Sequence, residues 1–95
     1  MSVFDNPIVF RAGLEMAGAT LRDIARALPG VDYSQIDALR EHGGAALSPK
    51  NRVRLPRVFA EMGVFAFRLP LCDTVHVIGA PGLITVRLAN HQGAA

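Results

Sequence analysis

The sequence predicts an α+β fold, and three observations predict it. Residues 7–42 carry apolar side chains at helical spacing, whereas residues 64–88 show the alternation and β-branched content of strands. Hydrophobic residues make up 51% of the chain and charged residues only 19%, which is typical of a packed core. The length of 95 residues suits one domain, which we place at 1–89 with a flexible C-terminal tail at 90–95.

Three short helices are predicted in the first half of the chain. Asn6 is a typical N-cap before Pro7, and the helix that they begin ends near Gly18. The second helix begins at Thr20, where an acid three residues later has the spacing of a capping box, and it ends at Pro29-Gly30. The third helix begins after Asp32, with Gln35 as its capping partner, and ends at His42-Gly43-Gly44.

The basic segment that follows has two interpretations. Residues 51–55 alternate polar and apolar side chains, and Pro56 favours extended geometry at the residue before it. We therefore predict an extended segment at 51–55, then a short fourth helix from Pro56 to Met62. The alternative is one longer helix that starts at Pro49 with Ser48 as its cap, in which Pro56 would stand in the helix interior.

The last third of the chain predicts a C-terminal antiparallel β-meander. Strands are expected at 64–69, 74–78 and 83–88, with Pro70 ending the first and a type II turn at 80–83 joining the other two. That turn sets a register with three cross-strand pairs, namely Val77 with Val86, Val75 with Leu88, and His76 with Arg87.

The residue types needed for catalysis or metal binding do not converge in this sequence. Cys72, Asp73 and His76 form the only local grouping, and Cys72 and His76 would stand about 13 Å apart on a strand, too far for proton transfer. One cysteine and three scattered histidines have no metal-ligand spacing, and no glycine-rich loop precedes a helix. We predict a protein that is not an enzyme and that has no cofactor, metal or small-molecule substrate.

Sequence features also predict the compartment. A single cysteine cannot form an internal disulfide, and the first residues lack the basic and apolar regions of a signal peptide. No apolar run approaches the 18 residues of a membrane span. We expect a cytoplasmic protein, or one assembled into a particle from the cytoplasm, that is not secreted and has no membrane partner.

The basic segment is the first candidate binding site. Ten basic and eight acidic residues give a formal charge of +2, a weak overall field, yet four cations lie within eight residues. Alternation would place two of the arginines on one exposed face and Val53 and Leu55 in the core. We predict a docking strip for an acidic protein partner or for a nucleic-acid backbone, formed by Lys50, Arg52, Arg54 and Arg57.

An excess of apolar residues is the second candidate binding feature. Phe65 and Phe67, with Leu69, form one face of a strand whose opposite face, Val64 and Ala66, is apolar too. Such a strand is either sandwiched in a core or part of an interface, so Phe65 and Phe67 are predicted partner-binding residues. Four apolar residues before or at the start of the first helix are also expected to lie beyond a small core, namely Val3, Phe4, Ile8 and Val9.

These observations favour a small non-enzymatic interaction or assembly protein, a subunit of an oligomeric or virion-type complex that binds itself or a protein partner. The alternative is a small DNA-binding regulator, because 20–41 resembles a helix-turn-helix hairpin and 50–57 is basic. Gln35, Arg40, Arg52 and Arg54 would then contact nucleic acid, although the second helix of the hairpin carries more acid than base. A third possibility is an inhibitor that docks on a partner enzyme.

Overall fold

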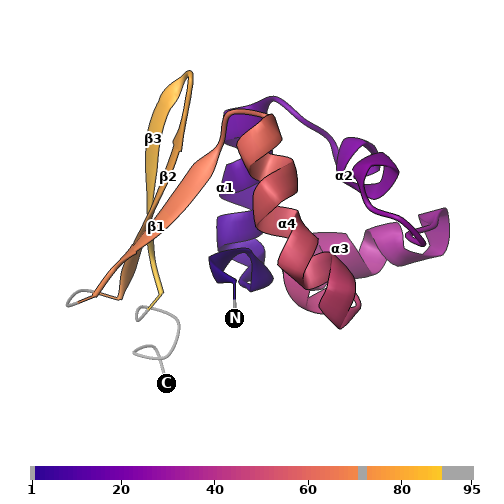
Figure 1. Cartoon of the computed structure of the whole chain (residues 1–95). Coiled ribbons are helices and arrows are strands. Elements are labelled where there is room, and N and C mark those ends of the chain that lie inside the picture. The colour runs from indigo at the N-terminus through magenta and orange to yellow at the C-terminus, as the bar shows by residue number, and fades with distance from the viewer. Residues whose placement is uncertain (1, 71–72, 89–95) are drawn as a thin grey trace.

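The computed structural model describes residues 2–70 and 73–88, and over these residues it confirms the α+β fold (Figure 1). The described α-helices are α1 (Pro7–Ala17), α2 (Leu21–Ala27), α3 (Ile36–His42) and α4 (Pro49–Glu61), and three short 3-10 helices are η1 (Val3–Asp5), η2 (Tyr33–Gln35) and η3 (Gly43–Ala46). The strands β1 (Phe65–Leu69), β2 (Thr74–Gly79) and β3 (Gly82–Arg87) follow in the last third. The predicted helices and strands thus appear in the expected order, apart from the basic segment.

Local hydrogen bonds start the first two helices where the sequence predicts. The side-chain oxygen of Asn6 accepts from the N–H groups of Ile8 and Val9, at 2.9 and 3.2 Å. Thr20 and Asp23 form the predicted capping box, in which each side chain accepts from the backbone of the other. Each of these contacts spans two or three residues, so short-range sequence is enough to predict it.

One continuous helix, α4, replaces the predicted extended segment at 51–55 and the short helix from Pro56 to Met62. Both of these predictions are wrong, and the alternative start at Pro49 with a Ser48 cap is confirmed. A proline in a helix interior costs about 3 kcal/mol. Leu55 and Phe59 are fully buried on α4, and burying two such side chains contributes about 3–6 kcal/mol, which offsets that cost.

The three strands form one antiparallel sheet in the order β1-β2-β3, which confirms the predicted meander. The β2–β3 register differs from the prediction by two residues, because Val75 lies opposite Val86 rather than Leu88. Only residues 80 and 81 connect the strands, since Gly82 begins the returning strand at a φ of 143°, a conformation that favours glycine. A shift of two residues leaves every side chain on its predicted face.

Among residues 2–70 and 73–88, helices cover only one face of the sheet. The α1 helix packs against β2 and β3, and the side chains of Val75, Val77 and Val86 on that face are buried. Figure 1 shows the sheet beside the helices with no helix on its other side. Among the described residues, no helix has both the length and the apolar character needed to cross a bilayer.

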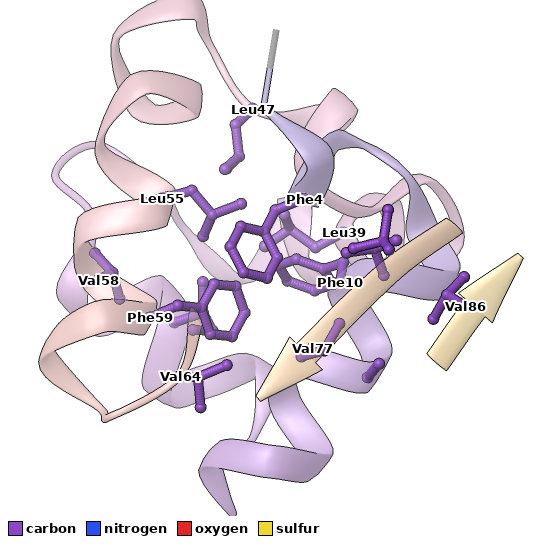
Figure 2. Close-up of a cluster of buried hydrophobic side chains, with 14 of the residues drawn as sticks. Phe4, Phe10, Leu39, Leu47, Leu55, Val58, Phe59, Val64, Val77 and Val86 are labelled. Atoms are coloured by element: carbon purple, nitrogen blue, oxygen red, sulfur yellow. The ribbon is translucent and has the colours of Figure 1, made fainter. Parts of the chain in front are cut away.

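Aromatic rings occupy the centre of the core (Figure 2). Phe4 stacks on Phe59 with ring centroids 4.3 Å apart, and Phe10 meets the same ring edge-on at 5.8 Å. Phe4 and Val9 are therefore core residues, contrary to the expectation that the residues around the start of α1 lie beyond the core. For Phe4 the reason is the η1 turn, which folds the chain before α1 back against α4. Val9 lies on the buried side of α1 itself.

Candidate protein-interaction surface

The outer face of the sheet carries an apolar cluster that we call the outer patch. It consists of Phe65, Phe67, Ile78 and Leu83, whose exposed fractions lie between 40% and 55%. Three of them form one row across the strands, because Phe65 lies opposite Ile78, and Ile78 opposite Leu83. Among the described residues only one other large hydrophobic side chain, Val53, is exposed to this extent.

Strand alternation explains how one strand supplies apolar side chains both to this outer face and to the core. Successive side chains of a strand point to opposite faces, so Phe65 and Phe67 point outward when Ala66 packs against the core. Val64, just before β1, is fully buried. The prediction that this segment is apolar on both faces is confirmed, and the face bearing both phenylalanines is the one left open.

Two shallow grooves continue from the outer patch towards α4. The first, of about 250 Å³, lies between Phe65 and Phe67 of β1 and residues 2–4, and reaches Pro56. The second, also about 250 Å³, is lined by Ser2 and Pro56 again and extends to Val53. The two grooves share these lining residues, so the outer patch and the exposed side of α4 belong to one continuous surface.

The exposed side of α4 carries three cations in a row, which we call the α4 stripe. Lys50, Arg54 and Arg57 have helical spacing and are exposed, and Val53, between them, is 80% exposed. None of the three cations forms a hydrogen bond or ion pair with another described residue. At 1.5 Å per residue the stripe is about 10 Å long.

Arg52 lies away from this stripe. On a helix, residues two apart point about 200° from each other, so the prediction that Arg52 and Arg54 share a face is wrong. The Arg52 Nε and Nη2 atoms donate to the carbonyl oxygens of Leu47 and Ala45, at 3.0 and 2.8 Å. Arg52 therefore binds the end of η3 and lines the second groove, so we do not count it among the unpaired cations of the α4 stripe. The prediction that Val53 is a core residue is also wrong, whereas that for Leu55 is confirmed.

The DNA-binding alternative names two further residues, Gln35 and Arg40. Gln35 is the N-cap of α3, and Arg40 lies within that helix. Gln35 is half-buried, and its Oε1 accepts from the N–H of Asp32 at 3.4 Å. Arg40 Nη1 is 2.6 Å from Asp37 Oδ1 on the same helix. Both side chains thus have partners within the protein, and the exposed carboxylates of Asp37 and Glu41 lie on the same short helix.

The grouping of Cys72, Asp73 and His76 is only partly visible, because Cys72 lies outside the described residues. Asp73 forms an ion pair with Arg68, with Nη2 and Oδ1 2.6 Å apart. His76 lies between Phe67 and Thr85 in the sheet, and its side chain has no hydrogen bond or ion pair with the described residues. Within residues 2–70 and 73–88 no three acidic, histidine or cysteine side chains are grouped to hold a metal ion.

Three residues of this surface were not singled out from the sequence. Ile78 and Leu83 could have been found from strand parity, because both share a face with His76 rather than with the buried valines. Val53 could have been found from the alternative helix starting at Pro49, on which it falls beside Arg54. Comparison of the chain with protein-family models, with curated proteins and with solved structures finds no match.

Proposed function

We propose that this protein is a non-enzymatic assembly subunit that binds a protein partner through the outer patch. One observation carries the proposal: four large apolar side chains gather, half-exposed, on the one sheet face that no described helix covers. A contiguous apolar patch on a small protein marks an interaction site more often than scattered apolar residues do. The single cysteine of the chain is consistent with assembly in the cytoplasm.

The free energy gained by burying the outer patch indicates how much more surface the partner must contact. Complete burial of one large apolar side chain contributes about 1.5–3 kcal/mol, so finishing the burial of four half-buried ones contributes roughly 4 kcal/mol. A micromolar complex requires about 8 kcal/mol. The outer patch supplies about half of that, so the partner must also contact the neighbouring grooves or the α4 stripe.

The cations of the α4 stripe indicate that the partner is acidic. The α4 stripe presents Lys50, Arg54 and Arg57 without partners among the described residues. Val53, which lies between them on α4, lines the second groove, and that groove shares Ser2 and Pro56 with the groove at the outer patch. A carboxylate placed against an arginine forms a charge-assisted, often bidentate contact. We therefore propose a partner with an apolar contact area flanked by acidic side chains.

The test is affinity purification from an extract of the native cells, with three tagged variants compared against the wild-type protein. Phe67→Ser removes an outer-patch side chain, Arg54→Glu reverses a charge of the α4 stripe, and Arg26→Glu is a control on α2, outside both. We expect one protein species that the wild type and the control retain and that both other variants lose. Circular dichroism verifies that each variant is folded.

A partner retained equally by all three variants would refute the proposal, because binding would then lie elsewhere. If only Phe67→Ser loses the partner, the outer patch is supported as the contact area, and the proposal that the partner is acidic is refuted. Loss with Arg54→Glu alone would refute the outer patch as the main contact area.

A DNA-binding regulator is the second candidate, and one contact favours it. Asn51, in the first turn of α4, donates to the carbonyl oxygen of Pro29 at 2.9 Å, so the α4 stripe begins beside the turn of the α2–α3 hairpin. One nucleic-acid backbone could then contact both. Retention on duplex DNA that falls steeply with salt, and that Arg54→Glu abolishes, would support this candidate, whereas protein packing has no such salt slope.

A further inference from the structure

The two edges of the sheet differ in how they are protected against pairing with another strand. Edge strands present unpaired N–H and C=O groups, and proteins guard them with prolines, inward-pointing charges or covering segments. At β1, Arg68 is a charged residue on the core-side face and pairs with Asp73, Pro70 follows the strand, and η1 packs beside it. At β3, residues 82–87 include no proline and no charged residue on the core-side face.

The backbone groups that β3 leaves free can be identified from one hydrogen bond. The N–H of Leu88 donates to the carbonyl oxygen of Asp73 at 2.8 Å, and hydrogen-bonded residues alternate along an antiparallel ladder. The N–H and C=O groups of Leu83, Thr85 and Arg87 therefore point away from β2. All three residues are exposed, and β3 pairs with no other described strand.

A groove of about 690 Å³ runs along this free edge. One wall is β3, including Ile84 and Val86, and the other is one side of α1, including Ile8, Arg11 and Glu15. An added strand would thus lie in a groove with a helix wall on the core side of the sheet. Arg11 and Glu15 are exposed and form no ion pair with each other or with another described residue.

We infer that β3 pairs antiparallel with β3 of a second copy of this chain, to give a two-fold dimer with a continuous six-stranded sheet. The edge of β3 shares only Leu83 with the outer patch and uses its backbone rather than its side chain, so this inference does not depend on the proposed function. In a register centred on Thr85, the free groups of Leu83, Thr85 and Arg87 face the same groups of the second copy. Three hydrogen-bonded pairs then form about six backbone hydrogen bonds.

The side chains complement one another in the same register. Thr85 meets Thr85 of the second copy, and Ile84 meets Val86, and both are favourable cross-strand pairs. Arg87 lies opposite Leu83, so the two copies of Arg87 stay about 13 Å apart and do not repel each other closely.

The helices add complementary charge. Because α1 lies over β2 and β3, about one strand spacing from the two-fold axis, the two α1 helices would lie about 10 Å apart, the usual distance of packed helices. The axis makes them antiparallel, and Arg11 of one copy then lies toward Glu15 of the other. Opposite charges face each other in both halves of the dimer, which is why a second copy suits the groove.

Sedimentation equilibrium over a range of concentrations tests the inference. Thr85→Pro removes an N–H that points away from β2, so it leaves the β2–β3 ladder intact. We expect a dimer for the wild type and a dissociation constant raised about thirtyfold in the variant, because each of two symmetry-related hydrogen bonds contributes roughly a factor of five. Arg11→Glu should also weaken the dimer, and adding Glu15→Arg to it should restore the dimer.

Amide hydrogen exchange gives a readout that does not depend on any variant. Exchange at Leu83, Thr85 and Arg87 should slow as the protein concentration rises, whereas exchange at Ala66 and Arg68, on the opposite edge, should not change. A monomer at all concentrations, with these three amides exchanging rapidly throughout, would overturn the inference. So would a dimer that survives Thr85→Pro and is lost with Phe67→Ser, because the outer patch would then join the copies. Protection at the β3 edge only after another protein is added would also overturn it.

Discussion

The side-chain amide of Asn51 donates a 2.9 Å hydrogen bond to the carbonyl oxygen of Pro29, 22 residues earlier in the chain. Asn51 is 5% exposed and lies in the first turn of α4, whereas Pro29 follows α2. This contact joins α4 to the turn between α2 and α3. The Oδ1 atom of Asn51 is buried and accepts no hydrogen bond from the described residues, so the amide makes one bond where it could make more.

Asn51→Ala should lower the free energy of unfolding by about 1–2 kcal/mol, because the carbonyl of Pro29 loses its donor and a small cavity forms. Urea unfolding measures the change. The exposed neighbour provides the control, since Lys50→Ala should change stability by no more than about 0.5 kcal/mol. Equal stabilities for the two variants would show that the contact contributes nothing.

Arg52 and Arg54 should respond differently to truncation. Arg52→Ala removes two hydrogen bonds to the carbonyl oxygens at the end of η3, and bonds from a charged donor contribute about 1.5–3 kcal/mol. Because Arg52 remains partly exposed, we expect a loss of about 1–2 kcal/mol in thermal or urea unfolding. Arg54→Ala, on the exposed side, should stay within about 0.5 kcal/mol. The reverse order of the two effects would contradict the assigned geometry of α4.

Pro56→Ala should stabilise the protein. Pro56 stands inside α4, where it cannot donate to the carbonyl four residues earlier, and alanine restores that donor. We expect the free energy of unfolding to rise by about 1 kcal/mol or more. Pro49→Ala is the matched control, because proline is tolerated at the first helical position and its removal should be neutral or slightly destabilising. A destabilised Pro56→Ala variant would mean that the contacts of Pro56 along the grooves outweigh the missing hydrogen bond.

The capping box of α2 should give stability that depends on pH. The backbone N–H of Thr20 donates to Asp23, which is the main reason that the pKa of this carboxyl lies below its ordinary value of 3.8, with smaller contributions from the Thr20 side chain and Arg26. A lowered pKa in the folded state means that the stabilising contribution is complete above pH 3.8 and is lost as the pH falls through the lowered value.

A comparison of wild type with Asp23→Asn isolates this contribution, because the other carboxyl groups are common to both proteins. The wild type should be more stable than the variant at neutral pH, and thermal unfolding at decreasing pH should show the difference shrinking below pH 3.8. A difference that stays constant down to strongly acidic pH would exclude the capping carboxylate as its source.

Short-range chemistry was enough to predict much of this fold. The caps at Asn6 and Thr20 bind backbone groups two or three residues away, so residue identity and spacing alone place the starts of α1 and α2. Alternation likewise predicted which faces of β2 and β3 hold Val75 and Val86, and a register shift of two residues did not change them. The same alternation marked Phe65 and Phe67 as candidates for an interface.

The path of the basic segment, and with it much of the candidate site, depended on tertiary structure. Locally, Pro56 disfavours a helix, and the alternation at 51–55 resembles a strand. Phe59 packs against Phe4 and Phe10, which lie more than 40 positions earlier, and Leu55 is buried in the same core. This burial offsets the cost of the proline and keeps α4 continuous. Because α4 is continuous, Arg52 points towards the carbonyl oxygens at the end of η3, and Lys50, Arg54 and Arg57 lie in a row on the exposed side. The sequence determined the chemistry of these side chains, and long-range burial decided which of them face solvent, because its free energy is summed over contacts that no local pattern contains.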